Sequence, residues 1–380
     1  MQSFKAEEKI LKRISVFFFL VIVVFGLVSC SEKEQVEIKK EETTKVIEVE
    51  TPKIEEIVAE PQPSEPEIDP TKTEISLLTG LPCTPEVKNM RPIAVMINNL
   101  HQSYPQQSIS YADILYECDM EGGITRLMGI YNEFKNVGNI GSTRSARDYF
   151  VEIADSHDAI FVHAGGSPSA YERIKNSKTD NIDGVNMYSI ADITFWRDKD
   201  RIKQCGYEHS MMTSGEKVCS AIDLLKYRTE FNNSYSSFCF NEEFKEPVSL
   251  VTANSLTLEH SEYLTVKFDY DEDKKEYFKY SFGEEHIDGT NGVQLSFTNV
   301  LILYVKEKVV DEVGRLQIEL NTSGKGIYLT GGKALEIEWT KDKNGSPFSF
   351  TYNGDELCLN PGKTHITLFN KNREAYVIIQ

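Results

Sequence analysis

Hydrophobic positions divide the chain into two stretches with different periods. Between residues 75 and 230, apolar runs at 93–98, 112–118 and 124–131 predict strands, and apolar residues with helical spacing follow them. Beyond residue 231 the helical period disappears, and short alternating runs are separated by Asn-Gly and Asp-Gly turn signals. The pattern predicts an N-terminal α/β domain with a mixed sheet (75–230), followed by a C-terminal all-β domain (231–380), an antiparallel sandwich or barrel.

The segment from residue 119 to 174 contains the clearest turns and helix starts of the chain. The Glu121-Gly122-Gly123 turn connects two of the predicted strands as a hairpin. A helix is predicted from Ser145, because Asp148 lies three residues further on, as in a capping box. Apolar residues follow at positions that fall on one face of this helix. A last amphipathic helix is predicted over residues 214–226.

A short buried strand, predicted over residues 159–162, delivers His163 to its end. Gly165 and Gly166 follow, and then Ser167, which is the expected N-cap of a second helix with proline at its first position. Two helix N-termini would therefore lie on either side of one strand, at its carboxyl end. Open α/β sheets commonly bind ligands there, so this region is the predicted site.

Arg144 and Arg147 are the most informative residues of that region. Positive side chains in the first turn of a helix oppose the helix dipole and need an acidic partner. The partner is either a protein carboxylate, from Asp119, Glu121 or Asp148, or an anion of a ligand held by guanidinium and free helix N–H groups. The second alternative predicts that both arginines and the 165–167 loop line one anion-accepting pocket beside His163.

Several further side chains are candidates for the same ligand. His163 is expected to be structural rather than catalytic, and Ser167 a cap rather than a nucleophile, since no Gly-x-Ser-x-Gly elbow surrounds it. Trp196 either closes the core or forms a stacking platform for a sugar ring, with Arg197 and Asp198 hydrogen-bonding at its edge. The candidate ligand-binding residues are Glu121, Arg126, Ser142, Arg144, Arg147, His163, Gly165, Gly166, Ser167, Trp196, Arg197, Asp198 and His209.

The first 29 residues have the layout of a lipoprotein signal peptide. Four basic residues precede an apolar run at 16–28, and Leu-Val-Ser-Cys ends it as a lipobox at Cys30. We expect cleavage before Cys30, a lipid with palmitate-type chains on its sulfur, and anchoring at the extracytoplasmic face of the cell membrane. Residues 31–74 contain 14 acidic and 6 basic residues and five prolines, so the segment 30–74 is predicted to be a disordered tether.

The net charge and the spacing of the cysteines restrict the classes of partner, metal and cofactor that we expect. Residues 75–380 carry 43 acidic and 31 basic residues, which excludes nucleic acid as an expected partner because phosphate contacts need clustered Lys and Arg. No zinc-type spacing or cofactor motif occurs, so no metal and no cofactor is expected. Disulfides are permitted outside the cytoplasm, but the scatter of the cysteines favours free thiols. The six cysteines other than Cys30 are Cys83, Cys118, Cys205, Cys219, Cys239 and Cys358.

Nearly all of the chain after the tether resembles the YerB-type bacterial lipoproteins, which carry a pair of domains of unknown function. The resemblance in the first domain rests on residues 91–99, 121–126, 144–147, 163–168 and 195–201. In the second domain it rests on His286, Asp288, Gly292, residues 314–315 and residues 359–362. The family pattern has His-Asn where this chain has His209 and Ser210. The resemblance implies a surface lipoprotein with this domain order and supplies no reaction.

Two classes of function follow from these features. The first is a binding module for a polar or anionic component of the cell envelope, either a polymer or a partner protein. The second is an envelope hydrolase or transferase with an acid/base site around His163, Glu121 and His209. The sequence has no recognisable nucleophile or metal motif, which favours the first.

Overall fold

The computed structural model describes residues 69–232, 235, 238–343 and 345–380. The predicted signal peptide, Cys30 and the tether up to residue 68 lie outside the described residues. The described residues belong to one compact unit. None of the helices in the described ranges has the length and apolar character needed to span a membrane.

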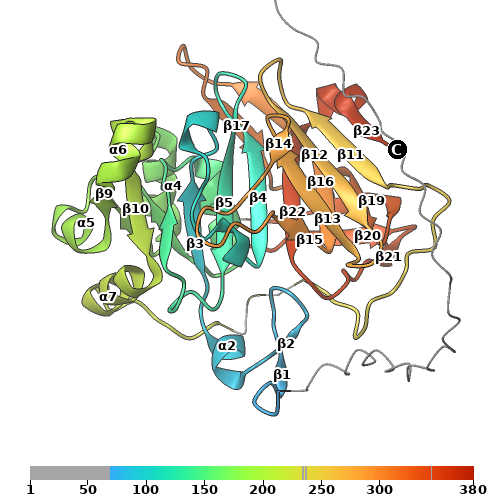
Figure 1. The fold of residues 1–380 in the computed structure, drawn as a ribbon, viewed down its shortest axis with the longest axis horizontal. Coiled ribbons are helices and arrows are strands. Elements are labelled where there is room, and N and C mark those ends of the chain that lie inside the picture. The colour runs from blue at the N-terminus through green and yellow to red at the C-terminus, as the bar shows by residue number, and fades with distance from the viewer. Residues whose placement is uncertain (1–68, 233–234, 236–237, 344) are drawn as a thin grey trace, which may run out of the picture. The chain divides into compact units, whose positions relative to one another are not determined.

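The N-terminal segment mixes helices and strands, as its two hydrophobic periods predict (Figure 1). Its strands are β1 (Glu74–Ile75), β2 (Pro82–Cys83), β3 (Ile93–Ile97), β4 (Ile114–Asp119), β5 (Thr125–Tyr131), β6 (Asn139–Gly141), β7 (Ile160–His163), β8 (Asn181–Asp183), β9 (Trp196–Arg197) and β10 (Met211–Ser214). Its helices are α2 (Pro85–Asn89), α3 (Asp148–Ser156), α4 (Pro168–Ser177), α5 (Tyr188–Thr194), α6 (Lys199–Cys205) and α7 (Gly215–Leu225). Short 3-10 helices are η1 (His101–Ser103), η2 (Ile109–Tyr111) and η3 (Tyr207–His209).

The C-terminal segment is built from strands, apart from the 3-10 helix η4 (Lys371–Tyr376). The strands are β11 (Ser255–Glu259), β12 (Thr265–Asp271), β13 (Glu276–Ser281), β14 (Glu284–Glu285), β15 (Ser296–Phe297), β16 (Asn299–Val309), β17 (Leu316–Glu319), β18 (Ser323–Thr330), β19 (Lys333–Thr340), β20 (Ser349–Tyr352), β21 (Asp355–Glu356), β22 (Thr364–Asn370) and β23 (Val377–Ile379). Nearly all of its strand pairs are antiparallel, and β16–β22 is a parallel pair. The predicted fold class is confirmed.

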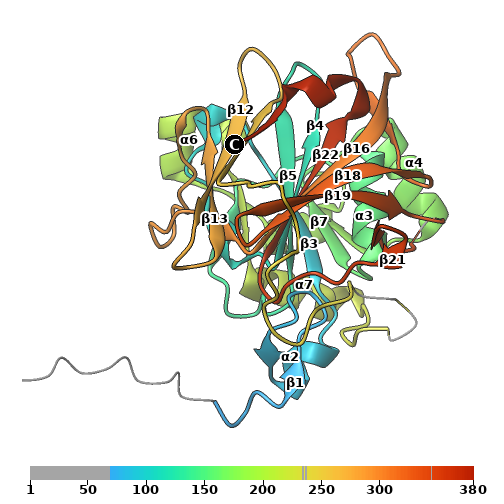
Figure 2. The ribbon, with the colours of Figure 1, turned by 90° about the vertical axis from the view of Figure 1, so that its right-hand side faces the viewer.

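One twelve-stranded sheet contains strands of both segments. Its order runs β21-β20-β19-β18-β16-β22-β4-β5-β3-β7-β8, with β17 paired to β16. The two segments meet where β22 pairs in parallel with β4, from Thr364 opposite Ile114 to Leu368 opposite Cys118. Figure 2 shows the resulting continuity, with the red strand β22 beside the teal strands β4 and β5. The proposed boundary near residue 231 therefore lies between segments that share backbone hydrogen bonds.

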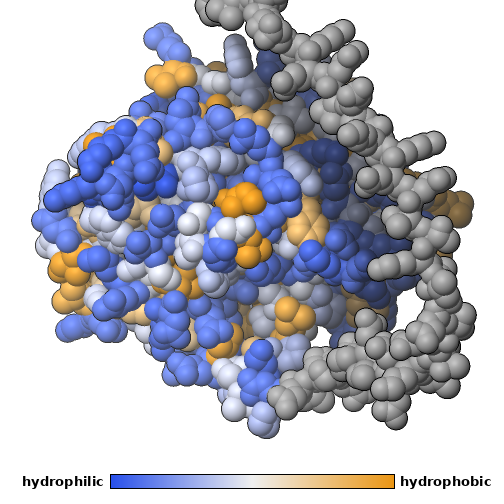
Figure 3. All heavy atoms as spheres, in the orientation of Figure 1, coloured by the Kyte–Doolittle hydropathy of each residue, from blue (hydrophilic) through white to orange (hydrophobic). Residues whose placement is uncertain are grey.

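Both faces of this sheet are covered. On one face, α3 packs Tyr149, Phe150 and Ile153 into a buried cluster with side chains of β4 and β16. On the other face, β11 and β12 of a six-stranded sheet contribute to a second buried cluster. The order of this sheet is β14-β13-β12-β11-β23, with β15 paired to β13. Each cluster draws on both segments, so the cores of the two segments are continuous. The face of the molecule in Figure 3 is mostly hydrophilic, with hydrophobic residues scattered over it.

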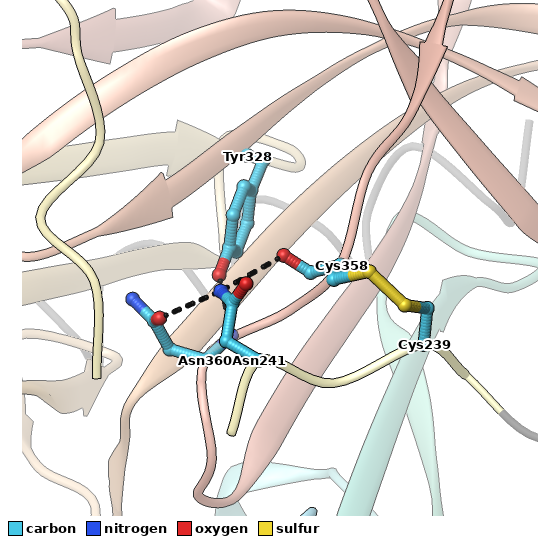
Figure 4. Close-up of a disulfide and its surroundings, with 5 residues drawn as sticks. All are labelled: Cys239, Asn241, Tyr328, Cys358 and Asn360. Atoms are coloured by element: carbon cyan, nitrogen blue, oxygen red, sulfur yellow. Dashed lines mark hydrogen bonds between the residues drawn. A yellow bond between two sulfur atoms is a disulfide. The ribbon is translucent and has the colours of Figure 1, made fainter. Parts of the chain in front are cut away.

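Two local predictions were wrong. The helix predicted from Ser145 begins at Asp148, because the Ser145 hydroxyl donates to the backbone oxygen of Ala164 at 3.0 Å instead of capping the helix. The favoured free thiols are contradicted by a disulfide between Cys239 and Cys358 (Figure 4). Among the described residues, Cys83, Cys118, Cys205 and Cys219 are free, as expected.

Candidate functional site

The predicted site region forms at one end of the large sheet. Strands β3, β4 and β7 end there, at Ile97, Asp119 and His163, and the antiparallel strand β5 begins there at Thr125. The tight turn between β4 and β5 brings Glu121 to this end, and both of its glycines adopt positive φ angles that favour glycine. The hairpin predicted from the sequence is therefore present.

Arg147 is paired with a protein carboxylate. Its side chain is 8% exposed, and its Nη2 donates to Oε1 of Glu121 on the β4–β5 turn. Its Nη1 donates to the backbone oxygen of Ala146 at 2.9 Å. Burial raises the pKa of Glu121, but the hydrogen bond from Arg147, a backbone hydrogen bond and the charges of Arg147 and Arg126 together outweigh it and leave that pKa lowered. For Arg147, the ion-pair alternative is the one the structure contains.

Arg144 is also paired, although not with any of the three carboxylates considered from the sequence. Its Nη2 donates to Oε1 of Glu208 in η3, whose side chain is 65% exposed. The hydrogen bond and the charge of Arg144 lower the pKa of Glu208. Asp119, one of the expected partners, instead accepts from Nδ1 of His260 at 2.6 Å. An exposed carboxylate such as Glu208 holds its partner weakly, because water solvates both groups when they separate.

Arg126 differs from both neighbours because it forms no close ion pair in the described structure, although the charge of Glu121 acts on it from a longer distance. It is 6% exposed, and among the described residues no carboxylate oxygen lies within 4.0 Å of its guanidinium. Its Nη1 donates to the backbone oxygen of Ser145 at 2.5 Å. Burial, together with the positive charges of Arg147 and Arg144, lowers the pKa of Arg126 to about 9. We call Arg126, Arg144 and Arg147 the arginine cluster.

Polar atoms without hydrogen-bond partners accumulate at the same end of the sheet. Nε of Arg147 and Oε2 of Glu121 are buried and unbonded in the described structure, as are Nε2 of His260 and Oε1 of Glu307. Buried polar groups are almost always hydrogen-bonded, so such atoms need an explanation. A ligand with both donors and acceptors would supply the missing partners for Arg147 and Glu121.

His163 is enclosed rather than presented to a ligand. It is fully buried, its Nδ1 lies 2.8 Å from the backbone oxygen of Gly165, and its Nε2 lies 3.3 Å from Oδ1 of Asn181. Burial lowers the pKa of His163. Asp183 accepts from the Gly165 amide at 2.8 Å and so occupies that side of the loop. These contacts fit the structural role expected for His163, and they place both of its ring nitrogens against protein oxygens.

Three other predicted site residues, Ser142, Gly166 and Ser167, lie in different local environments. Ser167 accepts from the amide of Ala170 at 3.1 Å as the N-cap of α4, with Pro168 next. Ser142 is buried. Gly166 packs near Tyr171. None of these three predicted residues contacts the arginine cluster through a hydrogen bond in the described structure.

The exposed aromatic ring of the predicted patch is that of Tyr207, whereas the sequence had pointed to Trp196. Trp196 is half-buried in β9, with Nζ of Lys217 5.7 Å from its ring centre. Asp198 caps α6 by accepting from two backbone amides. Arg197 stacks on Tyr207, with 4.2 Å between its guanidinium carbon and the ring centre. Tyr207, which the sequence did not single out, is the exposed aromatic residue next to the arginine cluster.

His209 connects this patch to the end of β3. Its Nδ1 lies 2.8 Å from the side-chain nitrogen of Asn98, so the neutral ring accepts a hydrogen bond there. Burial and the charge of Arg144 lower the pKa of His209. The structure thus brings Glu121, Arg126, Arg144, Arg147 and His209 to one end of the sheet.

A second polar cluster, also missed from sequence, lies between the two sheets. Glu117 of β4 is fully buried, with its Oε2 3.1 Å from Nζ of Lys279 in β13 and 3.3 Å from Nε2 of His365 in β22. Thr125 donates to Oε1 of Glu117 at 2.6 Å, and Asn99 donates at 3.2 Å. Burial raises the pKa of Glu117, but the charge of Lys279, together with the hydrogen bond from His365 and the charges of His260 and His365, outweighs it and holds that pKa well below its usual value. We call this set the inter-sheet ion cluster.

Two buried histidines should make the free energy of unfolding depend on pH in the acid range. Burial lowers the pKa of His157 and His365 to about 4. The unfolded chain takes up protons below about pH 6.5, whereas the folded chain takes them up only near pH 4, so the free energy of unfolding should fall as pH drops between those values. Urea unfolding at pH 7, 5.5 and 4.5 measures this. His157→Phe should flatten the dependence, and an unchanged urea midpoint would contradict the expectation.

Two cavities lie apart from the arginine cluster. One of about 700 Å³ is lined by charged side chains that include Arg91, Asp155 and Asp180. The other, of about 750 Å³, is lined by Met90, Phe134 and residues of α7. No arginine of the cluster lines either of them. Within the described ranges, no group of three or more His, Cys, Asp or Glu side chains is arranged to hold a metal ion.

The fold and its paired segments correspond to a known family. The domain described as "Protein of unknown function (DUF3048) N-terminal domain" matches residues 78–228, and the corresponding C-terminal domain matches residues 255–366. "Putative lipoprotein YerB" of Bacillus subtilis (strain 168) is 31% identical over 297 residues, which cover 77% of this chain and 85% of that protein. The chain therefore belongs to the DUF3048 family, and the predicted YerB-type resemblance is confirmed.

The structural comparison agrees. The crystal structure of YerB protein from Bacillus subtilis matches with a TM-score of 0.71 and 27% sequence identity, covering 81% of this chain and 99% of that chain. The shared fold thus includes both segments of the present chain.

Proposed function

We propose that this protein is a membrane-anchored extracytoplasmic lipoprotein that binds an anionic component of the cell envelope at the arginine cluster. The lipobox at Cys30 and membership in a family with a lipoprotein relative support the anchor. The observation that carries the binding site is Arg126, a buried guanidinium without a carboxylate partner beside two further arginines. A ligand anion would supply a closely paired negative charge, whereas Glu121 acts on Arg126 only from beyond 4.0 Å.

The balance of charge makes this cluster unusual within the chain. Residues 75–380 are acidic overall, yet three arginines share two carboxylates at this end of the sheet, and one of these carboxylates is exposed. Burying an unpaired charge costs free energy of folding. A fold that retains a buried charge at this cost is typical of a binding site, since activity commonly requires locally destabilising groups.

Binding fits these residues better than acid/base catalysis. His163, the leading candidate base, has both ring nitrogens within hydrogen-bonding distance of protein oxygens and is fully buried. Glu121 is engaged by Arg147, and the pKa of Glu121 is lowered, whereas a general acid at neutral pH requires a raised value. The alternative of a hydrolase or transferase around these residues therefore gains no support from their surroundings.

Replacing Arg126 with methionine separates a binding role from a structural one. We expect Arg126→Met to weaken binding of inorganic pyrophosphate or polyphosphate at least tenfold, because a charge-assisted hydrogen bond contributes about 1.5–3 kcal/mol. The melting temperature should stay the same or rise, since a buried unpaired charge is removed while the side-chain volume is nearly kept. Titration calorimetry of the full chain in detergent, combined with thermal unfolding, measures both quantities.

Lys267→Met is the matched control. It removes one positive charge from β12, at a side chain 45% exposed that pairs with Asp269, and should leave anion affinity unchanged. If Arg126→Met lowers the melting temperature by several degrees and leaves anion affinity unchanged, Arg126 is structural and the proposed site is wrong.

A further inference from the structure

We infer that the anionic ligand is a glycan: a sugar ring stacks on Tyr207 while a neighbouring carboxylate or phosphate displaces Glu208 from Arg144. This inference rests on the proposed function and specifies the ligand class. Tyr207 and Glu208 are adjacent in η3, so an aromatic face and a site for an anion lie side by side on one turn of backbone. Polymers that combine rings and anionic groups match this pair.

Tyr207 has the geometry of a stacking platform. It is 65% exposed, so most of its side chain is open to solvent. The Arg197 guanidinium stacks against its ring at 4.2 Å, and Nη1 of Arg197 donates to the Tyr207 backbone oxygen at 2.6 Å. Arg197 thus supports one side of the ring, and the exposed side can contact the apolar face of a sugar.

The backbone that carries this platform is fixed by contacts on several sides. Ser210 donates its hydroxyl to the Tyr207 oxygen at 2.7 Å. Nε of Arg201 donates to the His209 oxygen at 3.2 Å, and the His209 ring lies 2.8 Å from the Asn98 side chain. A platform that is already ordered loses less conformational entropy when it binds a ligand.

Glu208 occupies the place that a ligand anion would take. Its carboxylate accepts from Arg144, whose side chain is 19% exposed, while Glu208 itself is 65% exposed. Displacing it costs little because water solvates the released carboxylate. Glu208 therefore acts as an internal competitor, and the released Arg144, with Arg126 behind it, offers the planar donors that carboxylate and phosphate groups prefer.

Three probes separate the contribution of the sugar ring from that of charge. Oligogalacturonate supplies sugar rings with carboxylates, phosphorylated dextran supplies sugar rings with phosphates, and linear polyphosphate supplies charge alone. Affinities are measured by calorimetry for the full chain in detergent at one fixed salt concentration, because charge-driven binding depends on salt. The wild type should bind at least one of the two glycans more tightly per charge than polyphosphate, and that glycan identifies the anion.

Two exposed-site variants test the two halves of the inference. Tyr207→Ala should weaken binding of the preferred glycan about tenfold, as expected for loss of one stacked ring, and leave polyphosphate binding unchanged. Glu208→Gln should tighten binding of all bound polyanions several-fold, because the competing carboxylate is gone. Thermal unfolding of each variant confirms that the fold is intact.

The outcomes distinguish this inference from the proposed function. If Arg126→Met weakens polyanion binding but Tyr207→Ala does not weaken glycan binding, the glycan inference is overturned and anion binding stands. A Glu208→Gln variant that binds more weakly than wild type overturns the competitor role. If the wild type binds none of the three probes, both the inference and the proposed anion site are overturned.

Discussion

Replacing Lys279 with methionine should lower the free energy of unfolding by about 3–5 kcal/mol, the usual cost of removing one partner from a buried ion pair. Lys279 and Glu117 are both fully buried, and 3.1 Å separates their charged atoms. After the replacement the Glu117 carboxylate would remain in the core beside His365, without its cation. Urea unfolding followed by tryptophan fluorescence measures the change.

The double variant Glu117→Gln/Lys279→Met is the internal control. It removes both charges, and the amide oxygen introduced at position 117 can keep the hydrogen bonds that Thr125 and Asn99 provide, so much of the lost stability should return. Glu117 belongs to the N-terminal segment and Lys279 to the C-terminal segment. Because the two segments also share one sheet and continuous cores, both the single and the double variant should still unfold in a two-state transition. If Lys279→Met alone is as stable as the wild type, the inter-sheet ion cluster contributes no net stability.

The second large effect is expected at the disulfide. Cys239 and Cys358 are 119 residues apart, and the chain-entropy model assigns about 5 kcal/mol to a loop of this length. The double variant Cys239→Ser/Cys358→Ser should therefore unfold at much lower urea concentration than the oxidised wild type. Dithiothreitol should reduce the stability of the wild type to that of the variant.

Cys205→Ser provides the comparison for this experiment. Cys205 is a free, partly exposed thiol, so its replacement should leave both stability and the response to dithiothreitol unchanged. Hydrogen bonds around the bridge, such as that from Asn241 to Asn360 at 3.0 Å, involve neither sulfur atom and should persist in the disulfide variant (Figure 4). Equal stability of oxidised and reduced wild type would mean that strain or residual structure in the unfolded chain offsets the entropic gain.

Local patterns were sufficient to predict most elements of the fold. Alternating and continuous apolar runs identified β4, β5, β12 and β13, because side-chain period and turn residues are properties of neighbouring positions. The cap at Ser167 followed for the same reason. The parallel pairing of β4 with β22 was not predicted, because it joins strands at opposite ends of the described chain and leaves no mark on either sequence.

The candidate site shows the same limit. The arginines and the Glu121 turn were identifiable because they are close in sequence and chemically unusual. The partner of Arg144, the platform of Tyr207 and the enclosure of His163 depend on tertiary packing, so periodicity could not reveal them. The disulfide was missed because its two cysteines have no characteristic spacing.

The pairing of β4 with β22 sets the order in which the chain can complete its fold. A ribosome makes β4 first, and about 245 residues separate the end of β4 from the start of β22. Protein synthesis proceeds at about 5–20 residues per second, so β4 is made roughly 12–50 s before its partner strand β22. Unpaired edges are templates for aggregation, so a chain that folded while it was being made would expose the β4 edge until β22 was complete. The large sheet is therefore complete only after the C-terminal strand β22 has been made, and not when the N-terminal segment is finished.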